Sequence, residues 1–521
     1  MLPLTENMRY NLKRQIIKGI THMNSITNQH EFRPVLPTVF GAKDYREFRR
    51  TLEEMDHILI ESGIEQRIIT QKIRDVEENL SEKREQNVNR RYRQGLRYSI
   101  LLGITGYSYR KLSIRATDSQ LFQWFTFSEQ FSYTDRLGTI RPLSKSSIER
   151  FEKLFSDEEI TQLIHDLNRS VADEKLADTI LYRETALRFD EIFADTTCVK
   201  SNIHFPVDWV LFRDASRTLV KAIMLIRSHG LFHRIGEPKS FITKMNKLCI
   251  EMTHTRKKKG AKKARKQVLR SMKKLMKIIE SHGKNYHQLL KDHWQDTDWS
   301  ELEAQLVLDR IDNILDQLPA AMNQAHERII GERRVANKHK ILSFYEKDVR
   351  ILVRGKSGAE VEFGNALYLA EQSDGLIVDW DFLQKQAPGD NKLAPGSFQR
   401  IQENYGPIAS YAADRGFDSP ENSIDLEELG IFNAICPRSV KELTARLEEE
   451  EFCRLQTRRG ATEGRIGIFK NAYLGKPLKS KGFTHRKIRI QWCILSHNLW
   501  KLGTMAAERR KEIDEEAEKI A

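Results

Sequence analysis

The sequence predicts an α/β protein in which strand-rich segments are interrupted by a long helical block. Residues 191–212 (EIFADTTCVKSNIHFPVDWVLF) alternate apolar and polar side chains and are rich in β-branched and aromatic types, as β-strands are. Residues 236–340 read as strongly helical, and strand-like patterns resume between residues 349 and 383. We therefore expect a sheet flanked by helices, with a helical segment inserted into its sequence.

The chain is long enough for several domains. Its 521 residues exceed the size at which one hydrophobic core keeps growing, so we expect two to four domains. Hydrophobic residues make up 40% of the chain, which is enough for a real core. The 5 cysteines are scattered without a CxxC pair, which argues against a zinc module or a disulfide framework and fits a reducing, cytoplasmic compartment.

Basic residues outnumber acidic ones. The chain has 86 Lys+Arg against 73 Asp+Glu, a formal net charge of +13 at pH 7, and such a surface attracts polyanions. The longest markedly apolar run, residues 98–107, is about half the length that spans a bilayer. Residues 1–10 lack the basic-then-apolar order of a signal peptide. We expect a polyanionic partner and no membrane role.

The N-terminal part of the chain is expected to be helical. Residues 1–90 predict a polar helical arm or a small helical domain, because apolar positions recur at three- and four-residue steps and the segment ends in a dense charged run. We expect this region to bind DNA. Residues 91–185 predict a second helical module of short packed helices, with Ser144–Ser147 supplying the side chains that begin a helix.

The sheet domain is expected to be split into residues 186–235 and 341–510, with residues 236–340 as a basic helical insertion and residues 511–521 as a charged tail. A strand is expected to end at Asp414, and the chain then closes with two helices. The other strand-like segments of the second part are residues 349–355, 361–370, 375–383 and 431–438.

The helical block contains a dense basic run, residues 256–279. Such a run contacts phosphates in many DNA-binding proteins, and each neutralised phosphate adds affinity that is independent of sequence. A solvated helix face with no partner explains the run equally well. The candidate DNA-binding residues here are Arg256, Lys257, Lys258, Lys259, Lys262 and Lys263.

Three acids occupy positions that suggest a shared site. Asp195 lies within a predicted strand, Asp414 at the end of another, and Glu463 on a predicted helix. If the fold gathers them, their carboxylates repel one another unless a cation lies between them. Mg²⁺ is the natural cation because it prefers oxygen ligands, with Mn²⁺ as an alternative. A pair of such ions promotes in-line displacement at phosphorus, so phosphodiester cleavage and transfer is the expected reaction class.

Two basic residues accompany Glu463 in the stretch RRGATEGRIGIFK. On a continuous α-helix, Glu463, Gly467 and Lys470 share one face, which places a metal-binding carboxylate beside a phosphate-binding ammonium. Arg459 precedes Glu463 by one helical turn. Its forked guanidinium and the mobile ammonium of Lys470 suit different oxygens of a phosphate. Arg415, in the turn after Asp414, is a further candidate for contact with the DNA backbone.

With these residues in place, the chain resembles the DDE transposases of bacterial insertion sequences, in the group with a tyrosine-arginine-glutamate-lysine signature around the third acid. Arg459, Glu463 and Lys470 match this signature at its spacing, whereas Gln456 stands where the tyrosine is expected. The segments ADTTCVKSNIHFP and ADRGF resemble the motifs of the first and second aspartates. LRYSILLGITGYSYRKLS resembles the N-terminal helical module and HNLWKLG the closing helix, so the likeness covers roughly residues 95–505.

The resemblance implies a ribonuclease H-like catalytic domain, a mixed sheet flanked by helices, with Mg²⁺ bound by Asp195, Asp414 and Glu463. It implies cleavage at the ends of the DNA element that encodes the protein, and strand transfer into target DNA. Double-stranded DNA is then the partner, Arg459 and Lys470 hold its backbone, and the protein is a homodimer when assembled on DNA. A cytoplasmic, nucleoid-associated location in a bacterium follows from the same likeness.

Two other functions fit parts of the sequence. A descendant of such an enzyme that binds DNA without cutting it would keep the basic surface, although the three acids at their expected places disfavour this reading. A metal-dependent nuclease that only hydrolyses DNA would keep the acids as well. Inverted repeats bounding the gene would favour transposition over hydrolysis.

Overall fold

A computed structural model describes residues 35–36, 38–76, 81–128, 143–255, 260–356 and 359–520. From Val39 onward the chain forms one compact unit, which is described below. Residues 1–34 of the expected N-terminal arm lie outside the described residues. So do four of the basic candidates, Arg256, Lys257, Lys258 and Lys259.

Helices account for the described regular structure before residue 190, as the sequence predicts. Ser144 begins one of them, because its hydroxyl accepts a hydrogen bond from the Ser147 backbone N–H at 3.1 Å. One helix, which extends from Glu82 to Thr105, runs through the boundary that we expected at residue 90. These helices are α2 (Lys43–Glu61), α3 (Ile64–Val76), α4 (Glu82–Thr105), α5 (Tyr109–Asp118), α6 (Gln120–Thr126), α7 (Lys145–Glu152), α8 (Asp157–Ala172) and α9 (Glu174–Leu181).

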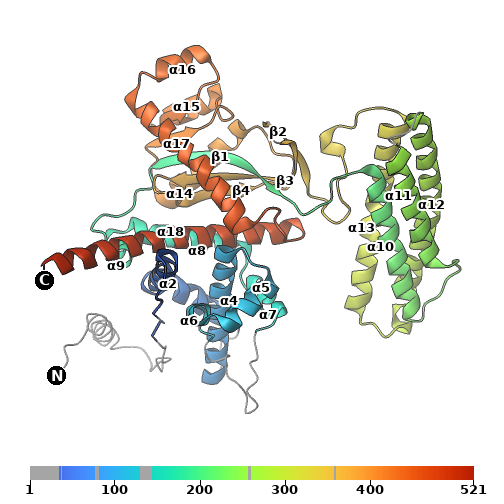
Figure 1. Ribbon diagram of the computed structural model, residues 1–521, viewed down its shortest axis with the longest axis horizontal. Helices are drawn as coiled ribbons and strands as arrows, with labels where there is room; N and C mark the ends of the chain where they lie inside the picture. The colour runs from blue at the N-terminus through green and yellow to red at the C-terminus, as the bar shows by residue number, and fades with distance from the viewer. Residues whose placement is uncertain are drawn as a thin grey trace. The chain divides into compact units, whose positions relative to one another are not determined.

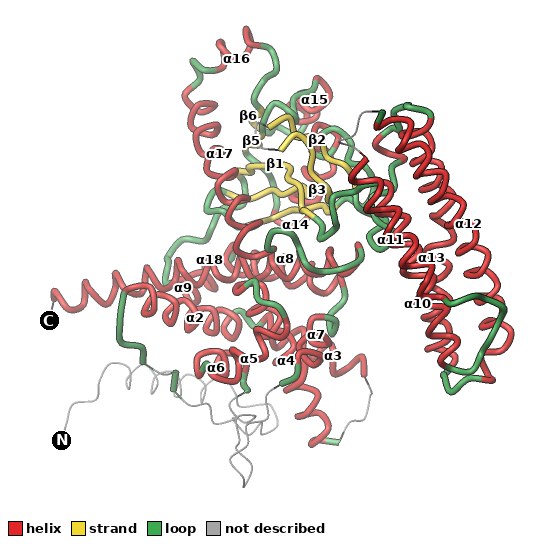
Figure 2. The backbone as a smooth tube through the Cα atoms, turned by 45° about the vertical axis from the view of Figure 1, so that its right-hand side comes forward, coloured by secondary structure: helices red, strands yellow, loops and turns green. Residues whose placement is uncertain are grey.

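The strands form one mixed sheet, which confirms the α/β class and the expected sheet flanked by helices (Figures 1 and 2). Its order is β2-β3-β1-β5-β6, and β4 also pairs with β3. The central β1 is antiparallel to β3 and parallel to β5, which is in turn parallel to β6. The strands are β1 (Glu191–Lys200), β2 (Arg350–Lys356), β3 (Ala359–Gln372), β4 (Ile377–Phe382), β5 (Ser410–Ala413) and β6 (Phe432–Ile435).

Further helices follow and cover the sheet. Phe193 of β1, Ala412 of β5 and Ala434 of β6 form a buried cluster with Phe452 and Leu455, which packs the helix that carries Glu463 against all three parallel strands. The α-helices of this part are α14 (Ala394–Tyr405), α15 (Pro420–Glu428), α16 (Val440–Arg446), α17 (Glu450–Ile468) and α18 (Phe483–Ile520). The short 3-10 helix η5 (Asp390–Lys392) precedes α14, and the π-helical turn η6 (Phe469–Leu474) follows α17.

A helical bundle lies between β1 and β2 in the chain, and its helices lie side by side in Figures 1 and 2. It consists of α10 (Asp208–Ser228), α11 (Pro238–Thr255), α12 (Ala261–His293) and α13 (Glu301–Ala325), with the short elements η2 (Trp294–Asp296), η3 (His326–Ile330) and η4 (Asn337–His339). The expected strand character up to residue 212, and an insertion that begins at residue 236, are wrong. Leu211, Ala215, Leu219 and Ile226 are buried in the bundle core at helical spacing, so α10 already belongs to the insertion.

The long helix α18 links the N-terminal helices with the sheet. It contacts α2, α4, α8 and α9, and it also contacts β4 and η6. At its crossing with α4 there is no room for a side chain on Gly103, because a Cβ there would lie 2.1 Å from the Ser496 hydroxyl. The expected charged tail is the end of this helix, which continues to Ile520. Within the part of the chain that the structure describes, no helix has the length and apolar character needed to cross a membrane.

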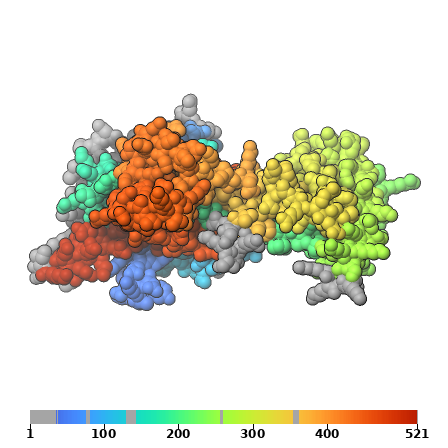
Figure 3. All heavy atoms as spheres, turned by 90° about the horizontal axis from the view of Figure 1, so that it is seen from above, coloured from blue at the N-terminus to red at the C-terminus, as the bar shows by residue number. Residues whose placement is uncertain are grey.

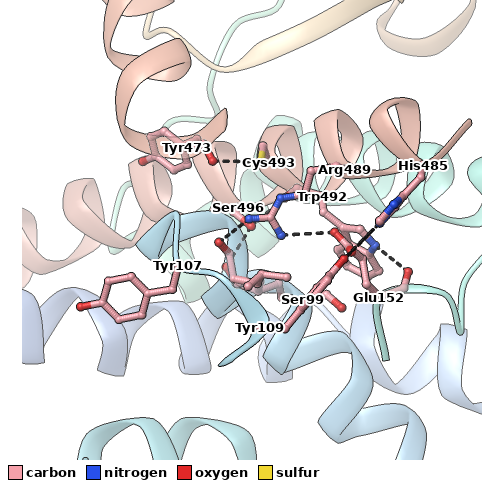
Figure 4. Close-up of polar contacts among 12 residues, drawn as sticks. Ser99, Tyr107, Tyr109, Glu152, Tyr473, His485, Arg489, Trp492, Cys493 and Ser496 are labelled. Carbon is pink, nitrogen blue, oxygen red and sulfur yellow. Dashed lines mark hydrogen bonds and ion pairs between the residues drawn. The ribbon is translucent and has the colours of Figure 1, made fainter. Parts of the chain in front are cut away.

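A buried carboxylate fastens α18 to the N-terminal helices (Figure 4). Glu152 of α7 is fully buried, and its side chain accepts hydrogen bonds from the Tyr109 hydroxyl and from Arg489 Nη1, the latter at 3.2 Å. His485 Nε2 lies 3.1 Å from the same carboxylate. Burial alone would raise the pKa of Glu152, but the hydrogen bond from His485, the charge of Arg489 and the Tyr109 hydroxyl outweigh it and lower the pKa to about 2.

This cluster predicts a specific loss of stability in acid. Because the folded-state pKa of Glu152 is about 2 and its ordinary value is 4.5, its contribution is present above pH 4.5 and is lost as the pH falls toward 2. The contribution at neutral pH is on the order of 3 kcal/mol. We expect the free energy of unfolding to fall more steeply over this window in the wild type than in Glu152→Gln, as measured by denaturant titration at several pH values. Glu149→Gln serves as the control, because the Glu149 side chain is 45% exposed and pairs with Lys153 at the surface, and it is expected to keep the wild-type slope. Equal slopes for all three proteins would contradict the prediction.

Candidate functional site

The register of two parallel strands places the first two acids side by side. Ile192 and Phe193 of β1 pair with Tyr411 and Ala412 of β5. Two residues farther along the same register, Asp414 comes level with Asp195. Asp414 directly follows β5, which ends at Ala413, as the sequence predicts.

The three predicted acids lie within electrostatic reach of one another. Burial and the carboxylates of Asp414 and Glu463 raise the pKa of Asp195 from its ordinary 3.8 to about 6. The Thr196 backbone N–H and the charge of Arg459 oppose this shift without cancelling it. The site is therefore electronegative around Asp195.

A buried glutamate that the sequence analysis missed fixes α17 on the sheet. Glu371 of β3 is 6% exposed, and its Oε1 accepts hydrogen bonds from Arg458 Nη1 (3.0 Å), Thr462 Oγ1 (2.7 Å) and Arg465 Nη1 (2.9 Å). These three residues share one face of α17, because they stand four and three positions apart. Glu463 follows Thr462 directly, so this anchoring face sets the rotation of the helix that presents Glu463.

Gln456, which stands where the resemblance expects a tyrosine, connects the strand ends to the signature residues. Its Nε2 donates to the carbonyls of Ala413 (3.2 Å) and Ala434 (2.5 Å), at the ends of β5 and β6. Its Oε1 accepts a hydrogen bond from Arg459 Nε at 3.0 Å. Arg459 Nη1 also lies 3.4 Å from Glu463 Oε1, and the Glu463 side chain is 60% exposed. Figure 3 shows the orange segment that includes α16 and α17 at the molecular surface.

Lys470 reaches the strand that carries Asp195. The expected continuous α-helix is wrong here, because α17 ends at Ile468 and the chain continues as the π-helical turn η6. From this turn Lys470 Nζ donates a hydrogen bond to Thr197 Oγ1 at 2.9 Å. Thr197 and Asp195 stand two residues apart on β1, so their side chains lie on the same face of the sheet. The hydrogen bond to Thr197 thus holds the Lys470 ammonium on the face of the sheet that carries Asp195.

Asp390, which the sequence analysis did not select, is a fourth carboxylate at this site. Its Oδ1 accepts a hydrogen bond from Thr196 Oγ1 at 2.8 Å. The turn after Asp414 passes so close that a Cβ on Gly416 would lie 2.8 Å from Asp390 Oδ2 and 2.9 Å from Asp414 Oδ1. A side chain at position 416 would therefore displace one or both of these carboxylates. The sequence around Asp390 carries only a turn signal, which does not report this tertiary contact.

Arg415 points outward from the same turn, and a second arginine braces it. The Arg415 side chain is exposed, which suits contact with a DNA backbone. Arg438 Nε donates to the Arg415 carbonyl (2.9 Å), and its Nη2 donates to the Gly416 carbonyl (3.1 Å). The Arg438 backbone N–H donates to Asp418 Oδ2 at 2.7 Å. Arg438 was not predicted, because nothing in the local sequence pairs it with this turn.

The described basic candidates of the insertion lie on a different element from the three acids. Lys262 and Lys263 are exposed near the start of α12, which packs against α10, α11 and α13. Lys262 Nζ lies 3.0 Å from Glu332 Oε2, and Lys266 pairs with the same carboxylate at 2.8 Å. Lys262 is thus engaged in a surface ion pair.

The donor set at the three acids suits Mg²⁺. Across the described segments, no three His, Cys, Asp or Glu side chains are grouped closely enough to hold a metal ion as they stand. Glu463 is turned toward Arg459, and its side chain is 60% exposed. The oxygen ligands and the mutual repulsion around Asp195 are what a hard divalent cation relieves, and an exposed glutamate rotates toward such an ion at little cost.

Repulsion among these acids predicts an unusual response to Asp195→Asn. The folded-state pKa of Asp195, about 6, exceeds its ordinary 3.8, so its carboxylate destabilises the fold increasingly as the pH rises from 3.8 to 6. The substitution is therefore expected to stabilise the metal-free protein by on the order of 3 kcal/mol at neutral pH. Mg²⁺ is expected to raise the melting temperature of the wild type and not of the variant. Thermal unfolding with and without Mg²⁺ measures both effects. Asp178→Asn, at an exposed position on α9, is the control, and a variant that still responds to Mg²⁺ would contradict the prediction.

The acids of β1, the β5 turn and α17 therefore lie beside Arg459 and Lys470, with Asp390, Gln456, Glu371 and Arg438 holding the surrounding chain in place. Such a site combines carboxylate oxygens, which suit a divalent metal ion, with cations, which suit a phosphate. Comparison of the chain with protein-family models, with curated proteins and with solved structures finds no match. The chemistry of the site itself is thus the basis for assigning a function.

Proposed function

We propose that this protein is a DNA transposase of the DDE type, which catalyses Mg²⁺-dependent phosphodiester cleavage at the ends of a DNA element and strand transfer into target DNA. One observation carries the proposal: Asp195 of β1 and Asp414, which directly follows the adjacent parallel strand β5, lie within electrostatic reach of each other and of Glu463. A mixed sheet flanked by helices is also what a ribonuclease H-like catalytic domain requires. The matching spacing of Arg459, Glu463 and Lys470 supports the same reading.

Asp195, Asp414 and Glu463 would hold Mg²⁺. Bound there, Mg²⁺ would supply activation of the attacking oxygen and stabilisation of the leaving oxygen at phosphorus. Asp195 and Asp414 are held by the sheet register, whereas Glu463 is exposed and free to turn. The protein thus provides two fixed ligands and one adjustable ligand, which completes the site when substrate and metal arrive together.

Arg459 and Lys470 would hold the DNA backbone. When Glu463 turns toward the metal, Arg459 loses its 3.4 Å partner at Nη1, while its Nε remains bound to Gln456. The guanidinium then keeps its orientation and presents free N–H groups to a phosphate. Lys470, held beside Thr197 on the face of Asp195, supplies a second positive charge next to the reacting phosphate.

Double-stranded DNA is the proposed partner, and two copies of the chain would assemble on a pair of element ends. The net charge of +13 and the exposed Lys263 and Arg415 suit a polyanion. Contacts of this kind supply affinity without sequence preference and weaken as salt rises. Recognition of the ends would then come from contacts to bases.

The test uses a plasmid that carries the gene with its native flanks, incubated with the full chain in Mg²⁺ or in EDTA. Mg²⁺-dependent cleavage at the gene boundaries, followed by joining to a second plasmid, is the expected result. Binding to the flanks without cleavage would overturn the proposal in favour of a DNA-binding descendant that no longer cuts. Cleavage without joining and without preference for the boundaries would overturn it in favour of a hydrolytic nuclease.

A further inference from the structure

A cavity of about 350 Å³ lies where the chain passes between the sheet and the helical bundle. It is lined by residues 202–207, which connect β1 to α10, by the first half of α10, by residues 342–346, which lead back to β2, and by Lys481. Its volume falls within the range of roughly 300–1,000 Å³ that is usual for small-ligand pockets. None of the acids at positions 195, 414 and 463 lines it.

Three cations surround this cavity, and they have no charged or hydrogen-bonding partner among the described residues. Arg217 and Lys221 stand one helical turn apart on α10, and Lys481 approaches from the segment before α18. All three side chains are exposed. Within the described residues, none of the three has an ion pair or a side-chain hydrogen bond. Three uncompensated positive charges around one cavity favour an anion with several oxygen atoms.

The acids in the lining do not neutralise these cations, because they are already engaged. Glu346 is buried, accepts hydrogen bonds from the Gly482 backbone N–H at 3.0 and 3.1 Å, and lies 3.5 Å from Arg486 Nη2. Asp214 lies 3.5 Å from Arg213 Nε. The cavity therefore keeps a positive excess.

Two aromatic side chains at the cavity are exposed and yet fixed in place. Phe205 is 74% exposed and packs edge-to-face against Phe363, with ring centroids 5.4 Å apart. Tyr345 is 56% exposed, and its hydroxyl hydrogen-bonds to Thr218 Oγ1 at 2.7 Å. An exposed aromatic face beside phosphate-binding cations is the combination that binds a base and its backbone in single-stranded nucleic acid.

We propose that this cavity binds a nucleotide, with its phosphate on Arg217, Lys221 and Lys481 and its base stacked on Phe205. This inference rests on the proposed transposase function in one respect: it assigns the bound nucleotide to an unpaired position of the DNA strand that is being processed. β1 connects the two sites: from Asp195 to the cavity entrance at Asn202 the chain advances roughly 20 Å at the rise of an extended strand. One DNA molecule can therefore occupy both sites.

The test measures binding of a single-stranded oligonucleotide that carries one 2-aminopurine, and of the matching duplex, to the full chain in EDTA. Arg217→Ala with Lys221→Ala is expected to weaken single-strand binding about tenfold relative to duplex binding. The matched control is Arg270→Ala with Lys274→Ala, an exposed pair at the same spacing on α12, which is expected to change both affinities equally. Phe205→Leu is expected to abolish the quenching of 2-aminopurine fluorescence while duplex affinity stays unchanged.

Equal losses for the cavity pair and the control pair, or retained quenching in Phe205→Leu, would overturn the proposal. Competition by deoxyadenosine monophosphate distinguishes the sources of the nucleotide. Displacement of the probe supports a nucleotide site open to free nucleotides, whereas no displacement together with the expected variant effects supports a site for the strand alone. Because EDTA removes divalent metal, a failure of DNA cleavage leaves these readouts unaffected, and the two proposals fail separately.

Discussion

Glu463→Gln is expected to lower Mg²⁺-dependent cleavage of DNA at the gene boundaries by at least about 10³-fold, a loss on the scale seen when one essential catalytic group is removed. The amide keeps the size of the side chain but loses the negative charge, and Glu463 is the adjustable one of the three proposed ligands. Binding to the same DNA is expected to persist, since Arg459 and Lys470 remain. Cleavage rates and DNA affinity, measured on the same preparations, separate these two effects.

The matched control for this prediction is Glu450→Gln, in the first turn of the same helix. Its side chain is exposed, and the substitution changes charge and size in the same way as at position 463. Wild-type cleavage by Glu450→Gln would assign the loss at position 463 to the site. Cleavage by Glu463→Gln within a few fold of the wild-type rate would remove Glu463 from the proposed metal ligands, and with it the transposase assignment.

Arg97→Ala is expected to destabilise the protein by about 3–5 kcal/mol, the usual cost of removing one partner from a buried charge cluster. Arg97 of α4 is fully buried, and its Nε and Nη2 donate to the Glu65 carboxylate at 2.6 and 2.9 Å. Its Nη1 donates to Asp56 Oδ1 at 2.6 Å and to the Phe125 carbonyl at 2.9 Å. Without the guanidinium, the Asp56 and Glu65 carboxylates lose the fully buried cation that joins α2, α3 and α4, and the Arg93 guanidinium, 3.8 Å from Glu65, is only partly buried.

Chemical denaturation followed by circular dichroism measures this loss. Arg91→Ala is the control, because Arg91 is exposed on the same helix and a surface substitution there is expected to change the free energy of unfolding by no more than about 0.5 kcal/mol. A similar small change for Arg97→Ala would show that water or neighbouring side chains compensate the two carboxylates.

Elements in which apolar and polar side chains alternate with a clear period were predicted well from the sequence. Helix α10 is the element for which this local pattern gave the wrong prediction. The hairpin strands and the end of β5 before Asp414 agree with their apolar and turn signals. Residues 208–212, in contrast, continue the apolar character of β1, although they begin a helix. Periodicity over so few residues does not separate a strand from a buried helix, and only packing against α11, α12 and α13 decides the outcome.

The residues of the candidate site also fall into those that the sequence predicted and those that it did not. Asp195, Asp414 and Glu463 were selected because strand ends, turns and helical spacing are readable along the chain. Asp390 and Glu371 were missed, because their roles depend on contacts with residues distant in sequence, such as the hydrogen bond from Thr196 to Asp390. Nothing in a single sequence reports which strand a loop carboxylate will meet in three dimensions.

The position of α18 in the chain has a consequence for biosynthesis. Helices α2, α4, α8 and α9 leave the ribosome long before α18. Part of their apolar surface becomes buried only when α18 packs against them. A nascent chain therefore holds an incomplete N-terminal core while the whole sheet is still being translated, a state that exposes apolar surface to chaperones and to aggregation. Translation that stops before residue 483 yields a chain whose first helices lack their last partner.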